Sequence, residues 1–318
     1  MSDAPDGSPP RKSRRAHNRA EFEAQVADIE AQVRATNARI EARTGRNLPL
    51  AIIIGLVLGF GFLFSLIVFK EIFMAFATVL LVFLSLELSS ALRSSGRDVP
   101  RVASAIAGAA IVPAAFYWHG EGQLLVGLGG MAFVTVWRLV ELVRPSHRTT
   151  AIALLRDILA GIFIQAYVVF LGSFAVLLTG ETNGQWWTLG FLIVVISTDV
   201  GAYATGLVFG KHKMAPRISP KKTWEGFAGS MTFATIAGIL VSIFLLHEQW
   251  YFGFLFGLAL AITATIGDLT ESLIKRDLGI KDISTWLPGH GGFLDRLDSV
   301  LPSAGVAFAL FVLFHGAR

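Results

Sequence analysis

Nine apolar runs dominate this 318-residue chain, and each is close to the length that a membrane-spanning helix requires. Such a helix needs about 20 mostly apolar residues to cross the hydrocarbon layer. Only 16% of the residues are charged and 53% are hydrophobic, which also indicates an integral membrane protein. We therefore expect an all-α polytopic membrane protein with about nine transmembrane helices, at approximately 48–67, 71–92, 102–118, 123–142, 157–179, 185–208, 226–246, 250–274 and 290–315.

Lysine and arginine concentrate in alternate loops between these runs, and the intervening loops hold only Lys70. Because basic loops face the cytoplasm, we expect a multi-pass protein of the plasma or inner membrane with a cytoplasmic N-terminus and an external C-terminus. The basic residues of the even-numbered loops are Arg93, Arg97, Arg101, Arg144, Arg148, Arg156, Lys211, Lys213, Arg217, Lys221, Lys222, Lys275, Arg276 and Lys281.

Residues 1–47 differ in character from the rest and predict a separate cytoplasmic arm, followed by a transmembrane domain over 48–318. Residues 1–20 are rich in Pro, Ser and Arg, which is typical of disorder. Apolar residues at heptad spacing over 18–43 then predict an amphipathic helix, at the membrane surface or in a coiled-coil dimer contact. The chain has no cysteine, which excludes disulfides, thiol nucleophiles and Cys-based metal sites.

Charged residues inside the eighth apolar run are the first sign of a site. Asp268, Glu271, Ser272 and Lys275 fall at i, i+3, i+4 and i+7, so they share one face of the predicted helix. Charged groups inside a membrane are costly and usually mark a substrate or ion pathway. The alternative is a buried ion-pair network that locks helices together, but a network needs no second carboxylate cluster nearby.

A second carboxylate cluster follows in the ninth run, where Asp295 and Asp298 lie one helical turn apart. The sequence PGHGG (Pro288 to Gly292) precedes them at the expected start of the helix. Glycines there allow a ligand to approach the backbone, and free amides at a helix N-terminus favour phosphate. His290 could donate to a phosphate oxygen, although a structural hydrogen bond is an equal alternative.

Two further groups complete the pattern. Asp199, Tyr203 and Gly206 share a face of the sixth predicted helix, and the basic loop after it contains SPKKTWEG. Its Ser219, Lys221, Lys222 and Thr223 would supply a dense set of donors for polyphosphate, although basic loops also contact anionic headgroups. Carboxylates suit magnesium and lysines suit phosphate, so together they predict phosphoryl or nucleotidyl transfer.

Other polar and aromatic positions have structural interpretations. Arg138 and Glu141 are spaced for a local ion pair at a helix end, and Glu87 is expected to pair with a nearby base. The Trp186–Trp187 pair is typical of an anchor at the external membrane interface.

The residues from Ser272 to Asp298 resemble the signature of the phosphatidate cytidylyltransferase (CDP-diacylglycerol synthase) family. DVGAYATG, ISPKKTWEG and GDLTES upstream also resemble segments of that family, and the resemblance covers roughly residues 50–316. The signature positions matched are Ser272, Lys275, Arg276, Lys281, Asp282, Ser284, Leu287, Pro288, His290, Gly291, Gly292, Phe293, Asp295, Arg296, Leu297 and Asp298.

The resemblance implies a magnesium-dependent enzyme that converts CTP and phosphatidic acid to CDP-diacylglycerol and pyrophosphate for phospholipid synthesis. It implies an active site mainly within 197–299 that faces the cytoplasm, with Asp268 and Asp295 as principal cation ligands, Asp298 and Asp199 supporting them, and potassium as a second cation. Lys275 and Arg276 join the catalytic set. The substrate-binding set is Ser219, Lys221, Lys222, Thr223, Glu225, Ser272, Lys281, Asp282, His290, Gly291, Gly292, Arg296, Asp199 and Tyr203.

The resemblance also implies a homodimer in the lipid bilayer, and no nucleic-acid partner is expected. One alternative is a related CTP-using enzyme that acts on an isoprenoid lipid phosphate or a polyprenol. A more remote one is a cation or proton transporter, which would also place carboxylates in the membrane but would not need the HGG-to-DRLD spacing.

Overall fold

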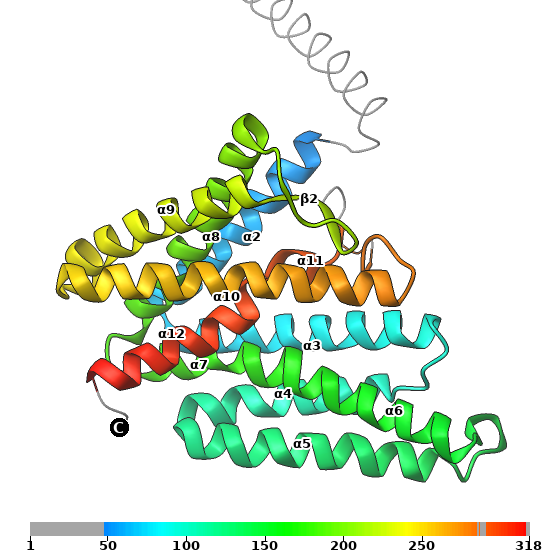
Figure 1. Ribbon diagram of the computed structural model, residues 1–318. Helices are drawn as coiled ribbons and strands as arrows, with labels where there is room; N and C mark the ends of the chain where they lie inside the picture. The colour runs from blue at the N-terminus through cyan, green and yellow to red at the C-terminus, as the bar shows by residue number, and fades with distance from the viewer. Residues whose placement is uncertain (1–47, 285, 287–290, 316–318) are drawn as a thin grey trace, which may run out of the picture. The chain divides into compact units, whose positions relative to one another are not determined.

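The computed structural model describes residues 48–284, 286 and 291–315 (Figure 1). The predicted arm over 1–47 and the signature residue His290 lie outside the described residues. The chain forms two units, one of residues 1–57 with 288–290 and the other of residues 58–287 with 291–318. In the first unit the described part is the beginning of helix α2, and all further features belong to the second unit.

Helices make up most of the described chain, as the apolar runs predict. Two π-helical stretches, η2 (Gln165–Phe170) and η3 (Ser242–Leu246), continue α6 into α7 and lengthen α9, and a short 3-10 turn, η1 (Pro145–His147), precedes α6. The α-helices are α2 (Leu48–Val68), α3 (Lys70–Ser94), α4 (Arg101–Tyr117), α5 (His119–Glu141), α6 (Ala151–Ile164), α7 (Leu171–Gly180), α8 (Gly184–Phe209), α9 (Trp224–Val241), α10 (Trp250–Asp277), α11 (Leu294–Leu297) and α12 (Val300–His315).

Seven helical segments of the described chain are long and apolar enough to cross a membrane, which supports the multi-pass prediction. Two further apolar helices, over Gly55–Val68 and Arg101–Tyr117, are shorter. The count of nine spans and the cytoplasmic N-terminus stay predictions. The seven segments are Lys70–Ser94, His119–Glu141, Ala151–Gly180, Gly184–Phe209, Trp224–Leu246, Trp250–Asp277 and Leu294–His315.

The all-α prediction is wrong at the basic loop after α8, which forms an antiparallel hairpin. Strand β1 (Lys213–Ala215) pairs with β2 (Ser219–Thr223), with Lys213 opposite Thr223 and Ala215 opposite Ser219. Proline at 216 and 220 opposes a continuous helix there, while an isolated hairpin tolerates proline because its outer edges are unpaired. The hairpin fixes the backbone that carries the predicted phosphate donors.

The predicted ninth helix over 290–315 is also interrupted. It forms a short α11 and a longer α12, with a turn at Asp298 and Ser299. Pro302 explains the break, because its ring would clash with the carbonyl of residue 298 and it has no N–H to donate to it. The turn places Asp298 at the junction of the two helices.

Glycines bring α8, α9 and α10 close together. A β-carbon at Gly201 of α8 would lie 2.7 Å from the Phe233 Cβ of α9, and one at Gly257 of α10 would lie 2.7 Å from the Thr235 Cα of α9. Small residues at such crossings allow helices in membranes to approach closely. This packing holds the polar faces of α8 and α10 at the same depth.

Trp187 belongs to the core of this helix group, so the prediction of an interfacial anchor is wrong for it. It is 4% exposed and packs edge-on against Phe252 of α10 and Phe311 of α12. The apolar run gave no sign of which aromatic ring would face inward, because both neighbours of Trp187 in space come from later helices.

A buried ionic network fastens α5, α6 and the α3–α4 connection, and it differs from the predicted Arg138–Glu141 pair. Arg138 is 1% exposed and binds Asp157 of α6 at 2.8 Å, while Asp98 binds the ring of His147 at 2.5 Å. Partial burial by itself would raise the pKa of Asp98, but the hydrogen bond from His147 and the charges of Arg138 and Arg93 hold that pKa below its ordinary value. Arg138 turns to Asp157 because that carboxylate is equally buried.

Candidate active site

A cavity of about 770 Å³ opens among α8, the hairpin, α9, α10 and the α11–α12 junction. Asp268 and Asp295 line this same cavity, although they come from different helices. The roles predicted for the lining residues stay predictions, but the structure brings most of them to one place. The predicted residues that line the cavity are Asp199, Tyr203, Ser219, Lys221, Lys222, Thr223, Asp268, Lys275, Asp295, Arg296 and Asp298.

Helix α10 presents the polar face that its spacing predicts. Asp268, Glu271 and Lys275 all line the cavity, while Ile262, Ile266 and Leu273 are exposed on other faces of the helix. Exposed apolar side chains on a membrane helix are expected to face lipid.

Lys275 joins α10 to α11. Its ammonium lies 2.5 Å from the Glu271 carboxylate and 2.9 Å from Oδ1 of Asp295. Glu271 is 1% exposed, and its second oxygen, Oε1, has no hydrogen-bond partner among the described residues. A buried carboxylate with one unmatched oxygen is costly unless a cation or donor reaches it. Glu271 therefore adds a buried carboxylate to the wall of the cavity, close to Lys275 and Asp295.

Backbone amides fix the orientation of Asp295. Its Oδ2 accepts hydrogen bonds from the Gly292 amide at 2.8 Å and the Ile283 amide at 3.3 Å, which leaves Oδ1 to Lys275. Asp298, one turn later, accepts from the Ser299 amide at 2.7 Å. The signature thus forms its own local hydrogen bonds around the first turn of α11.

The hairpin delivers a second lysine to the cavity. Lys222 of β2 lies 2.6 Å from Oδ2 of Asp268, and the guanidinium of Arg276 donates to the Ile218 carbonyl at 3.1 Å. Thr223 caps α9 by accepting from the Gly226 amide at 3.1 Å. The basic loop is thereby fastened to α10 at two points, which sequence spacing alone does not reveal.

Several predicted substrate-binding residues do not line the cavity. Glu225 binds the amides of Lys211 and His212 and the ring of His212, which holds the start of the hairpin. Ser272 reaches only Asp268, at 3.4 Å. Among the other predicted residues outside the lining, Arg276, Lys281 and Asp282 are exposed, whereas Gly291 and Gly292 form the backbone before α11.

The predicted metal ligands fit magnesium by chemistry, since Asp268, Asp295, Asp298 and Asp199 all offer hard oxygen donors to one cavity. No three of them have ligand atoms within 4.8 Å of one another in the described chain. Lys222 and Lys275 instead provide the positive charge next to Asp268 and Asp295.

Glu87 of α3 is a buried residue that supports the signature from outside it, and the predicted pairing with a base is wrong. Its carboxylate accepts a hydrogen bond from the Leu294 amide at 2.9 Å and another from the Ser284 hydroxyl. A β-carbon at Gly292 would collide with this carboxylate, so the close approach requires glycine. The sequence signal was an acid within an apolar run, but its partner lay 207 residues away.

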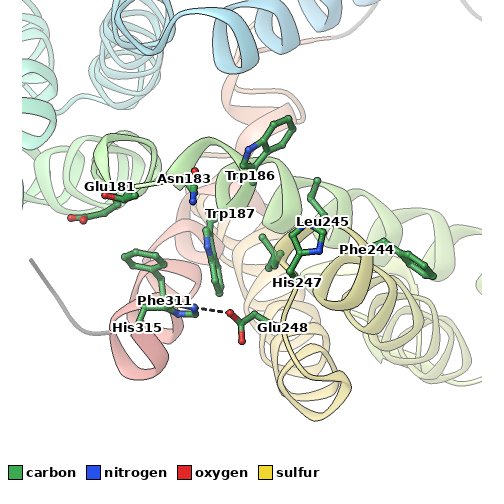
Figure 2. Close-up of a pocket in the computed structure, with 12 residues that line it drawn as sticks. Glu181, Asn183, Trp186, Trp187, Phe244, Leu245, His247, Glu248, Phe311 and His315 are labelled. Atoms are coloured by element: carbon green, nitrogen blue, oxygen red, sulfur yellow. Dashed lines mark hydrogen bonds and ion pairs between the residues drawn. The ribbon is translucent and has the colours of Figure 1, made fainter.

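A second cavity, of about 640 Å³, lies at the beginning of α8, the end of η3 with the connection that follows it, and the end of α12. Figure 2 shows Trp187, Phe311 and His315 close together there, with the His315 ring joined to Glu248 at 2.8 Å. Among the described residues, no lysine or arginine lines this cavity, so that part of the chain offers a triphosphate no permanently cationic donor here.

Comparison with known proteins shows which family and which relatives this chain resembles. The model of a family described as the cytidylyltransferase family matches residues 49–314. A phosphatidate cytidylyltransferase of Mycobacterium tuberculosis (strain H37Rv) is 39% identical over 278 residues, which cover 86% of this chain and 84% of the relative. One of Mycobacterium leprae is 40% identical over 280 residues, covering 85% and 89%. One of Brucella suis is 38% identical over 156 residues, covering 49% and 57%.

Proposed function

The chain belongs to the cytidylyltransferase family and is therefore a nucleotidyltransferase, and from that premise we propose that its active-site cavity transfers CMP from CTP to phosphatidic acid. The products would be CDP-diacylglycerol and pyrophosphate. The observation that carries the proposal is the convergence of Lys222, Lys275 and the carboxylates of three helices in one cavity of about 770 Å³.

In this reaction an oxygen of the phosphatidate phosphate forms a bond to the α-phosphorus of CTP. The bond from that phosphorus to the oxygen bridging the β-phosphorus breaks, and pyrophosphate leaves with the bonding electron pair. A strong base is not needed, because a phosphomonoester has its second pKa near 6 and is largely dianionic at neutral pH. The main task of the protein is to bring two anions together and to stabilise the charge that develops.

The two lysines are suited to that task because both side chains extend into the cavity from backbone positions that are fixed. Lys222 is held by the hairpin and Lys275 by α10, so each ammonium can exchange a carboxylate for a phosphate oxygen without a backbone change. Lys221, Ser219 and Thr223 line the same wall and supply further donors. We assign this wall to the triphosphate.

Asp268 and Asp295 would hold magnesium, with Asp298 and Asp199 supporting them and potassium as a second cation. Bound magnesium would neutralise and orient phosphate oxygens. The unmatched oxygen of Glu271 adds one donor that the predicted ligand set lacked. Five carboxylates line this cavity together with five basic side chains, and two of those bases, Lys222 and Lys275, are already paired with carboxylates.

The lipid would reach the cavity from the outer face of α8. Tyr203 and Leu207 line the cavity and are also exposed, so this wall joins the polar interior to a surface that can face acyl chains. We further propose nine spans, a cytoplasmic active site and a homodimer, as the loop charges and the family resemblance led us to expect.

The test is magnesium-dependent release of pyrophosphate from CTP by the purified chain, with and without phosphatidic acid. We expect pyrophosphate release that requires both magnesium and phosphatidic acid and that is lost when EDTA removes the magnesium. Stimulation by an isoprenoid lipid phosphate in place of phosphatidic acid would support the related enzyme, and release that ignores phosphatidic acid would contradict the proposal.

A further inference from the structure

We propose that the end of the α4–α5 helix pair carries a binding site for an anionic phospholipid, separate from the active-site cavity. A groove of about 590 Å³ lies there, with three arginines at one end and an apolar face along the rest. Its lining shares no residue with the active-site cavity. Figure 1 shows the α3–α4 and α5–α6 connections at the same end of the second unit as the end of α10.

Some guanidinium groups at the basic end of the groove are not paired with a carboxylate of the described chain. Arg93 is paired with Asp98 at 2.6 Å, but within the described residues Arg101 reaches only the Ser90 hydroxyl, at 3.5 Å. Arg144 makes no ion pair with any residue that the structure describes. Guanidinium groups bind phosphate oxygens in pairs and with good geometry, so two such groups at one rim favour a phosphate.

One acid also lines the groove and has to be counted. Glu141 accepts a hydrogen bond from the Trp137 indole at 3.0 Å, and its other oxygen, Oε2, is buried without a partner in the described chain. Asp98 neutralises Arg93, so Arg101 and Arg144 stand against the single charge of Glu141 and the rim stays positive.

The apolar wall explains why the ligand is a lipid and not a free phosphate. Val102 of α4 and Val136 and Val140 of α5 line the groove and are exposed, with Phe133 beside them. A phosphate at the arginines would place acyl chains along this wall, and the Trp137 ring would lie at the headgroup level, where tryptophan is enriched. Basic pockets between membrane helices at the cytoplasmic side are known to suit anionic headgroups.

The buried network beneath the groove holds the rim in place. The Asp98 amide donates to Asp157 at 2.9 Å, and Arg138 binds both Asp157 and the carbonyl of His147. These bonds fasten the segment before Arg101 to the segment after Arg144. A rim whose backbone is fixed in this way loses less entropy when it binds a headgroup.

The absence of native cysteine allows one groove position to be labelled. We would attach a fluorophore to Val136→Cys, whose parent side chain is 57% exposed, and measure quenching by brominated phosphatidylglycerol or brominated phosphatidylcholine in mixed micelles. Ile236→Cys on α9, with 54% exposure in the parent, is the matched control. Two arginines at about 1 kcal/mol each predict half-quenching at about 30-fold less phosphatidylglycerol than phosphatidylcholine at position 136, and no preference at position 236.

The arginines are tested on the same labelled protein. Arg101→Gln with Arg144→Gln should remove the preference at position 136, whereas Arg101→Lys with Arg144→Lys should keep most of it because the charge is preserved. Equal quenching by both lipids, or a preference that survives the glutamine pair, would overturn the proposal. Relief of quenching by inorganic phosphate would assign the rim to a free anion, and disulfide formation between two Val136→Cys chains would assign the groove to a second copy; each result would also overturn it.

Discussion

Replacing Glu87 by alanine should make the signature segment from Ser272 to Asp298 less ordered, although Glu87 itself lies outside that segment. The Glu87 side chain is buried in α3, and its carboxylate holds both the Ser284 hydroxyl and the Leu294 amide. Leu294 begins α11, whose first turn contains Asp295. The substitution removes the only described side chain that binds this amide from another helix, so the amide is left buried without its partner.

The magnitude follows from these two bonds. Each contributes about 0.5–1.5 kcal/mol net, and a buried donor left without a partner costs about 1–3 kcal/mol. The local free energy that orders the segment should therefore fall by about 2–4 kcal/mol. Because 1.4 kcal/mol changes an equilibrium about tenfold, the equilibrium constant that keeps the segment ordered, with Asp295 in place, falls at least about tenfold. Glu87→Gln keeps one acceptor oxygen and the shape, so its effect should be about half as large.

The measurements are CTP turnover with phosphatidic acid and thermal unfolding of the purified protein in detergent. For Glu87→Ala we expect turnover to fall at least about tenfold and the melting temperature to fall by roughly 5–10 °C. Glu71→Ala, an exposed acid in the first turn of the same helix, is the matched control and should change neither. Parent-like turnover in Glu87→Ala would refute the reasoning, because the segment would then hold Asp295 without α3.

Three further predictions concern the cavity and the buried network. Asp295→Asn should abolish CTP-dependent turnover while leaving the protein folded in detergent, and retained activity would remove Asp295 from the metal site. Lys222→Ala should raise the apparent KM for CTP about tenfold, while Lys211→Ala, outside the cavity, should not. Equal KM values for the two variants would indicate that the hairpin is an ordinary basic loop that does not bind CTP. Because the pKa of Asp98 is lowered in the folded state, its contribution to stability is present above the ordinary carboxyl pKa of about 4 and is lost as the pH falls through the lower folded-state value. Asp98→Asn should therefore flatten the acid side of the melting-temperature profile, and an unchanged profile would show that another group controls it.

Local pattern predicted correctly which polar side chains of α10 lie together. The i, i+3, i+7 spacing of Asp268, Glu271 and Lys275 placed them on one face of a helix, and they do line one cavity. Glu271 was recognised on that face but was not among the predicted metal ligands, although its side chain also lines the cavity. The hairpin was missed because its strands are short and polar, so they lack the alternation that indicates a strand.

The sequence by itself determined that this protein is built of apolar helices suited to a membrane and which polar side chains share a helix face, because both follow from periodicity and residue type within a single run. Only the tertiary structure decided the partners: Lys222 with Asp268, Lys275 between Glu271 and Asp295, and Glu87 beneath the signature. The physical reason is that helical spacing defines which face a residue occupies, whereas the choice of which faces meet depends on close packing between helices that are far apart in the chain.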